Sequence, residues 1–466
     1  MPRNSPSQRY FWIALFALLT ACGIAPPAPR TPTPPTITAM LVVETPTTLP
    51  TETPSPIPSL IFTSTPTPSV LFTLDAIRMA YVVDGNLYVQ DGSNQPIQLT
   101  HSGEDSAPIF SDDGRNIVFF RGQIPYDLYA INADGNGELA LLTSSQLVAL
   151  NLGYSDITEI RSLAFVPGTH QLLFNTHEFK PSDIVLENMN YLGAKPNLDL
   201  LLVDTDTAEI KRLLPPGEGG PFQVSPDGKM VGIQTINHID VIGLDGKIIR
   251  RNLATYPSAW VHLWTSNISW TQDSSKLNVI FPISIGSVLD STGPEPRTIW
   301  QYSINGNLAT VQIHLAPSPI GDSFNISPDG NWIIYTYYYY PGKTDEMVTT
   351  GIYLGNLRDG GSQLIEGAEL YGLPQSFEWS PDNIHFIFED RIQPQLYLGN
   401  INGETTPLHR GQFLGWIDAS HYLFGNGRIG EIGKEESLNL VNMPIPQSNA
   451  EPFTFIFLKH KTKEEK

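Results

Sequence analysis

The chain has 466 residues, and its 27 Lys and Arg against 47 Asp and Glu give a formal net charge of −20. A surface of that sign repels phosphate backbones, which argues against a nucleic-acid partner. Charged residues make up only 16% of the chain, while Gly and Pro number 38 and 40, a composition that favours turn-rich β structure over amphipathic helices.

The N-terminus has the pattern of a secretory signal peptide. Arg3 and Arg9 precede an apolar run at residues 10–19, and no acidic residue lies before it. The run is shorter than the roughly 20 residues that span a bilayer as a helix, so a permanent transmembrane anchor is the weaker alternative. We expect residues 1–21 to be the signal peptide.

The signal peptide ends at Leu19-Thr20-Ala21-Cys22, which resembles the lipobox of bacterial lipoproteins. The resemblance implies cleavage before Cys22 and a diacylglycerol on its thiol. Cys22 is the only cysteine, and the alternative is an ordinary signal peptide with a chance cysteine. Several acyl chains, at about 0.8 kcal/mol per buried CH₂, would hold the protein on a membrane. We expect a lipid anchor on the outer side of the cytoplasmic membrane, or on the outer membrane if the cell has one.

A tether rich in Thr and Pro is predicted at residues 22–69. Such a segment cannot bury a core and lacks many backbone donors, so disordered or extended polyproline-II structure is expected. Where extended, it would hold the following domain on the order of 100 Å from the membrane. Its physical role would be spacing.

A repeat begins near residue 77. Its first half is a short strand, a turn of the type Ser-Pro-Asp-Gly and a strongly apolar strand. In this turn Pro fixes φ, Asp accepts local backbone hydrogen bonds and Gly adopts a left-handed conformation. Clear copies lie at residues 110–120, 224–233, 326–335 and 379–388, and weaker copies lie at 165–168, 270–273 and 416–420.

The second half of the repeat is an alternating strand that usually ends in Asp-Gly or Asn-Gly, as at residues 86–92, 127–135 and 396–403. This pattern is typical of a hairpin, and a short fourth strand often follows. Four antiparallel strands repeated every 40 to 60 residues or so predict the blades of an all-β propeller. The unit resembles the PD40, or WD40-like, repeat of TolB-type propellers, which also occurs in peptidases related to prolyl oligopeptidase.

Eight modules can be counted, so an eight-bladed propeller over residues 70–458 is favoured, with seven blades as the alternative. The modules lie near residues 77–100, 101–143, 161–213, 221–254, 266–313, 323–365, 375–408 and 413–443. The first module lacks an inner strand, which either residues 70–74 or the apolar run at 452–458 would supply. Long insertions, at about 175–196 and 282–296, are expected to overhang one end of the ring, and residues 459–466 form a charged tail.

No catalytic constellation is found in the sequence. Gly-x-Ser-x-Gly is absent, so the activity of the related peptidases is not carried over. The turn aspartates lack the spacing of a calcium loop, and capping of the turns is the better account of them. The histidines show no ligand spacing either. We therefore predict no catalytic residue, no metal and no cofactor.

The most unusual local feature is a run of tyrosines that contains Tyr337, Tyr338, Tyr339 and Tyr340. One interpretation is a strand that enters a loop, with alternate tyrosines buried. The other is an aromatic platform for sugar rings or a peptide, since tyrosine offers a flat apolar face with a polar tip. These four residues are the candidate ligand contacts.

The sequence thus predicts a lipid-anchored, non-enzymatic scaffold that binds a protein, a peptide or a cell-wall glycan. The alternative is a propeller hydrolase or lyase whose site is assembled from carboxylates near the ring axis.

Overall fold

The computed structural model describes residues 73–150, 157–179, 199–235, 238–255, 267–280, 299–304, 310–313, 315, 324–339, 348–366, 374–390, 395–408, 412–434, 438–439 and 453–458. The chain divides into two units, Met1–Ser69 and Val70–Lys466, and all described residues belong to the second. The predicted signal peptide, tether and charged tail lie outside the described residues.

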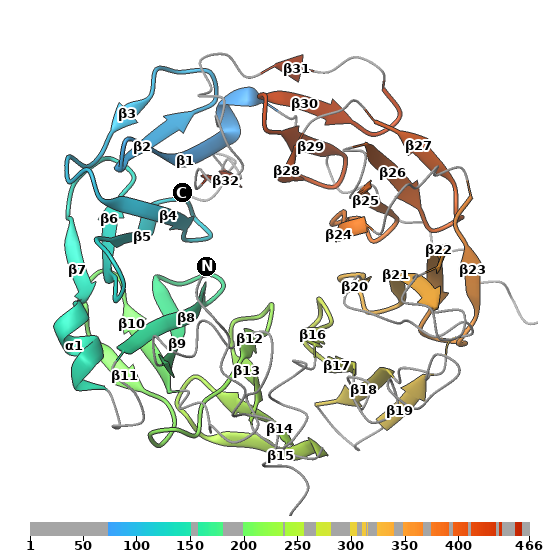
Figure 1. Ribbon diagram of the computed structural model, residues 1–466, viewed down its shortest axis with the longest axis horizontal. Coiled ribbons are helices and arrows are strands. Elements are labelled where there is room, and N and C mark those ends of the chain that lie inside the picture. Colours follow the sequence, from blue (N-terminus) through green and yellow to red (C-terminus); the bar gives the residue numbers. More distant parts are fainter. Residues whose placement is uncertain are drawn as a thin grey trace, which may run out of the picture. The chain divides into compact units, whose positions relative to one another are not determined.

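The described strands form eight four-stranded antiparallel sheets, which confirms the predicted eight-bladed propeller (Figure 1). From the ring's centre outward, the first four blades are as follows. Blade 1 contains β32 (Phe453–Phe457), β1 (Ile77–Val83), β2 (Asn86–Asp91) and β3 (Ile97–Gln98); blade 2 contains β4 (Asp105–Phe110), β5 (Asn116–Arg121), β6 (Asp127–Asn132) and β7 (Leu139–Leu142); blade 3 contains β8 (Ile157–Phe165), β9 (Gln171–Phe179), β10 (Leu200–Asp204) and β11 (Ile210–Arg212); blade 4 contains β12 (Phe222–Val224), β13 (Met230–Gln234), β14 (His238–Gly243) and β15 (Ile248–Thr255).

The other four blades have the same order of strands. Blade 5 contains β16 (Asn267–Trp270), β17 (Lys276–Ile280), β18 (Ile299–Ser303) and β19 (Thr310–Ile313); blade 6 contains β20 (Phe324–Ile326), β21 (Trp332–Tyr339), β22 (Val348–Asn356) and β23 (Ser362–Leu364); blade 7 contains β24 (Pro374–Trp379), β25 (His385–Asp390), β26 (Leu396–Asn400) and β27 (Thr405–Pro407); blade 8 contains β28 (Phe413–Trp416), β29 (His421–Phe424), β30 (Arg428–Glu431) and β31 (Leu438–Asn439).

The ring is closed by β32, which supplies the inner strand of blade 1. It pairs with β1 from Ile77↔Phe457 to Tyr81↔Phe453, so the second of the two alternatives for this strand is confirmed. The segment just before β1 forms instead a short 3₁₀ helix, Leu74–Ala76. Strands from opposite ends of the chain therefore share one sheet, and β1 has no free edge.

One short α-helix, which the sequence analysis did not predict, follows blade 2. Helix α1 (Ser144–Ala149) begins with a capping box, in which Thr143 accepts from the backbone N–H of Gln146 and the Gln146 side chain accepts from that of Thr143. Leu147 is fully buried and anchors the helix on the core. Within the described part of the chain, no helix has the length and apolarity needed to cross a membrane.

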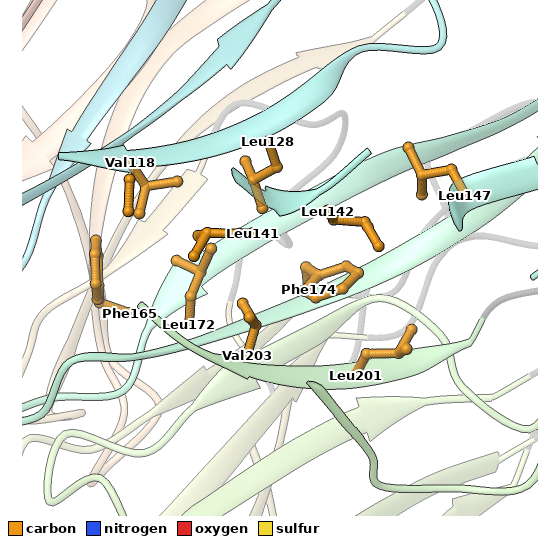
Figure 2. Close-up of a cluster of buried hydrophobic side chains, with 11 residues drawn as sticks. Val118, Leu128, Leu141, Leu142, Leu147, Phe165, Leu172, Phe174, Leu201 and Val203 are labelled. Atoms are coloured by element: carbon orange, nitrogen blue, oxygen red, sulfur yellow. The ribbon is translucent and has the colours of Figure 1, made fainter. Parts of the chain in front are cut away.

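The core consists of buried hydrophobic clusters between neighbouring blades. The cluster between blades 2 and 3, shown in Figure 2, contains Leu128 and Leu142 on one side and Phe174 and Leu201 on the other. Along β5, Ile117 packs toward blade 1, whereas Val118 packs toward blade 3. Because both faces of each blade are covered, the second strands read as nearly continuous apolar runs.

The two ends of the ring differ. Strands alternate in direction, so the turns after the first and third strands of blades 2 to 8, and the turn after β2 in blade 1, lie at one end. We call this end the turn face; it contains residues 111–115, 225–229 and 327–331. The other connections start and finish at the opposite end, the loop face. The two longest follow β9 and β17, whose last residues, Phe179 and Ile280, lie at the loop face. The first begins later than predicted because β9 continues to Phe179.

Candidate functional site

The turn face is built from a repeated hydrogen-bond network. In blade 4, the Ser225 hydroxyl donates to Oδ1 of Asp227 (2.7 Å), and the backbone N–H of Met230 donates to Ser225 Oγ (2.9 Å). The backbone N–H of Lys229 also donates to Asp227 Oδ1 (3.1 Å). The same pattern recurs at Ser111 and Asp113, at Thr271 and Asp273, and at Ser327 and Asp329. The turn aspartates therefore cap their own turns, as predicted.

These turns also link neighbouring blades. The backbone N–H of Asp227 donates to Ser274 Oγ of blade 5 (3.0 Å), and that of Asp329 donates to Asn383 Oδ1 of blade 7 (2.8 Å). Gly228 has a φ of +68°, and a Cβ there would lie 2.7 Å from the carbonyl oxygen of Pro167 in blade 3. A side chain at residue 228 would displace the neighbouring blade, whereas the same position in blades 5 and 7 has room for Ser274 and Asn383, which also have a positive φ. Much of the turn face is thus occupied with holding the ring together.

One histidine joins three turns of this face. His170 Nδ1 lies 2.9 Å from Asp206 Oδ2 within blade 3, and its Nε2 lies 3.2 Å from Asp113 Oδ2 of blade 2. Burial opposes the charged form of His170, but the hydrogen bonds from its ring to the two carboxylates outweigh this and raise its pKa. Burial also acts against ionised Asp113, whose pKa is nevertheless lowered by hydrogen bonds from Arg115, Ser111 and His170.

A pH dependence of stability follows from this contact. The raised pKa of His170 stabilises the fold below the ordinary histidine value of 6.5, and this contribution is lost as the pH rises through the folded-state pKa. The lowered pKa of Asp113 contributes above 3.8 and is lost in acid. We expect His170→Gln to lower the free energy of unfolding by up to about 1 kcal/mol, chiefly between these two values. Urea unfolding at pH 5 and pH 8.5 would measure it.

The matched control is His101→Gln, because the His101 side chain is exposed and hydrogen-bonds the Gln98 amide rather than a carboxylate. A His170→Gln effect that is equal at both pH values would contradict the ionic link between blades 2 and 3.

The innermost strands place a different set of side chains around the ring axis. The position two residues before the turn serine or its equivalent is Gln223 in blade 4, Ser269 in blade 5, Asn325 in blade 6 and Glu378 in blade 7. Indole N–H groups of the following blades donate to three backbone carbonyls at this position, from Trp270 to Gln223, from Trp379 to Asn325 and from Trp416 to Glu378, at 3.1 to 3.2 Å. The backbone at this position is thus fixed in three blades. The side chains of Gln223 and Glu378 are exposed, whereas that of Asn325 donates to the carbonyl of Phe377.

Glu378 and Glu389 are the most distinctive groups near the centre. Glu378 pairs with Ile387 on β25, so Glu389, two residues further along, lies diagonally across on the same face of blade 7. Such diagonal positions are about 7–8 Å apart. Burial raises the pKa of both carboxyls, and Glu378 nonetheless remains exposed to solvent. A raised pKa lets a carboxyl hold its proton more readily, which general acid catalysis requires.

The sequence analysis did not single out either glutamate. A signal for Glu378 was its place in the repeat, where blades 4 to 6 carry uncharged polar residues instead. Across the described ranges, no group of three or more His, Cys, Asp or Glu side chains is placed to hold a metal ion.

The structure places part of the tyrosine run on β21. Tyr335 is buried and stacks on Tyr353, and its hydroxyl donates to Ser362 Oγ (3.0 Å). Tyr337 is half-buried, meets Tyr353 edge-on, and lies toward the loop face. Tyr338 and Tyr339 end the strand, beyond a bulge in its pairing with β22.

Two kinds of predicted site residue lie outside the described residues. They are Tyr340 and the lipidation candidate, Cys22. For these positions the sequence pattern remains the basis of the prediction, and the role of the tyrosine run stays a prediction as well.

Comparison with known proteins shows similarity of fold. No protein-family model matches the chain, and no curated protein matches it. Among solved structures, an oligogalacturonate lyase in complex with manganese is 16% identical with a TM-score of 0.44, covering 68% of this chain and 82% of that one. A eukaryotic initiation factor is 13% identical with a TM-score of 0.49, covering 78% and 85%. A putative 6-phosphogluconolactonase from Bacteroides uniformis is 12% identical with a TM-score of 0.40, covering 82% and 99%. These names differ in kind, so the likeness assigns no activity.

Proposed function

We propose that this chain is a lipid-anchored envelope protein whose TolB-type propeller, built from PD40-like repeats, binds a protein, a peptide or a glycan at its loop face. The observation that carries the proposal is the difference between the two faces. On the turn face, the turn aspartates and several backbone groups hydrogen-bond within and between blades. The long connections belong to the loop face, and long loops on a rigid scaffold are common binding elements.

The tyrosine run also supports ligand binding at the loop face. Tyr337 presents a half-buried ring near the loop-face end of β21. The strand pairs with β22 at this residue and with β20 as far as Tyr335. An aromatic ring held in this way loses little conformational freedom when a sugar or peptide packs against it.

The anchor can be tested by changing its acceptor. Cys22→Ser removes the only thiol in the chain, so we expect the protein to move from the membrane fraction to the soluble extracytoplasmic fraction. Fractionation followed by immunoblotting would measure this. Unchanged retention in the membrane would rule out the lipid anchor and leave the propeller's binding role to be judged separately.

The binding face can be tested with a matched pair of isoleucines. Ile124 is 51% exposed on the loop face, and Ile384 is 44% exposed on the turn face. A photo-crosslinking amino acid at each position, in cells that express the anchored protein, is expected to give defined adducts at 124 and few at 384. Equal labelling at both positions, or adducts only at 384, would contradict the assignment of the loop face.

The second candidate function is a hydrolase or lyase, and the pair Glu378 and Glu389 favours it because both pKa values are raised. Turnover of a panel of hydrolase and lyase substrates that Glu378→Gln abolishes, without a change in thermal stability, would replace the scaffold proposal with this one.

A further inference from the structure

The outer strand of blade 4 differs from those of the other blades. In the described structure, the other seven outer strands, β3, β7, β11, β19, β23, β27 and β31, have two to four residues, whereas β15 has eight. Very short outer strands protect a sheet edge from pairing with another chain. β15 lies at the rim of the ring and ends its sheet, so none of the described strands pairs with its outer edge (Figure 1).

The charges of the outer strands are also confined to one region. Within the bounds of the eight outer strands, the charged residues are Lys211 and Arg212 on β11 and Arg250 and Arg251 on β15, and none is acidic. Arg212 pairs with the buried carboxylate of Asp199, and Lys211 donates to the carbonyl of Leu244. Against a net charge of −20, the outer strand of blade 4 is locally basic.

Apolar side chains adjoin the arginines of β15. Ile248 is 40% exposed and Ile249 is 36% exposed. The pairing of β14 with β15 is irregular, with Val241 opposite Arg250 and Ile242 opposite Ile248, which leaves Ile249 as an extra residue. This bulge gives two consecutive isoleucines access to solvent, where an even alternation would bury one of them.

The two arginines differ from the other basic residues of blade 4. Lys229 and Lys247 each pair with an aspartate of their own turn. Arg251 is exposed and has no ion pair or hydrogen bond among the described residues, and Arg250 donates only to the carbonyl of Ile249 while its Nε is buried without a partner. Both guanidinium groups can therefore form new ion pairs.

We propose that β15 is a second docking surface, which takes an extended acidic segment of a partner protein. Carboxylates of the segment pair with Arg250 and Arg251, and its apolar side chains cover Ile248 and Ile249. The bulge disfavours a continuous strand-on-strand ladder, so side chains carry most of the recognition. A flat anionic membrane is the less favoured occupant, because it would face the acidic surface around the strand as well, whereas a narrow segment contacts β15 alone. This surface lies on the rim, and its test is independent of the loop face.

The test uses the soluble Cys22→Ser protein and two fluorescent peptides, one with Glu alternating with Val and one with Lys alternating with Val. Fluorescence anisotropy at low ionic strength is expected to show binding of the Glu peptide only. The double variant Arg250→Glu with Arg251→Glu should weaken binding by about tenfold or more. Ile248→Ser with Ile249→Ser should weaken it severalfold at unchanged charge.

The matched control is Arg115→Glu with Lys229→Glu, which makes the same charge change at two side chains of the turn face that are 72% and 79% exposed. It should change affinity by less than about twofold. Equal loss in the control would show non-specific attraction, and equal binding of the Lys peptide would show the absence of charge selection; either overturns the proposal. Binding only to vesicles with anionic lipid also overturns it. If the arginine double variant does not fold, the affinities of Arg251→Ala and of the isoleucine variant for the Glu peptide test the proposal instead.

Discussion

Deleting residues 453–466 is expected to open the ring and to destabilise the propeller more than any single substitution. The deletion removes β32, whose Phe455 packs in the cluster between blades 8 and 1 and whose Ile456 packs in the cluster between blades 1 and 2. The backbone bond from Leu458 N–H to the Ala76 carbonyl (2.7 Å) is lost as well. The cost should exceed the roughly 2–5 kcal/mol of truncating one buried aliphatic side chain.

Circular dichroism during heating and size-exclusion chromatography would measure the result. We expect a lower melting temperature. We also expect self-association, because β1 becomes an exposed edge strand. The control is deletion of residues 459–466 alone, which retains β32 and should melt like the full chain. A peptide with the sequence of residues 450–461 should restore part of the lost stability by re-forming the β1–β32 pair. Wild-type melting of the longer deletion would refute the closure by β32.

This closure shows what the repeat could and could not reveal. The hydrogen-bonded turn recurs along the chain with the blades, so residues such as Ser225 and Asp227 allowed eight modules to be counted. The structure confirms this number of blades. The sequence offered two apolar runs as alternatives for the inner strand of blade 1, because apolar character alone does not say which run reaches β1. The choice depends on chain geometry, in which Leu74–Ala76 turns into β1 and the C-terminal strand lies alongside it.

Other features were missed because their signals are weak or non-local. The capping box of Thr143 and Gln146 is a readable helix start, but α1 is short and its tertiary anchor is the single buried Leu147. The length of β15 was hidden because the bulge removes the alternation that marks a strand. The relation of Glu378 to Glu389 depends on strand register, which composition does not encode.

Phe174→Ala is expected to have the largest effect of any single truncation in the cluster between blades 2 and 3. Phe174 is fully buried on β9, opposite Leu163 of β8 and Leu201 of β10, and Figure 2 shows its ring within the cluster. Removing a buried aromatic side chain loses its transfer free energy and leaves a cavity, at a cost of about 3–5 kcal/mol. Urea unfolding monitored by tryptophan fluorescence would measure this loss.

The matched control is Val148→Ala on α1. Val148 is 53% exposed and follows the buried Leu147, so its truncation should change the free energy of unfolding by no more than about 0.5 kcal/mol. Because the cluster joins two blades, the Phe174 variant should also loosen the contact of blade 3 with blade 2, and hydrogen exchange should increase in both β5 and β9. Faster exchange confined to β9 would mean that blade 3 unfolds by itself, and a loss below about 1 kcal/mol would contradict a filled core at this interface.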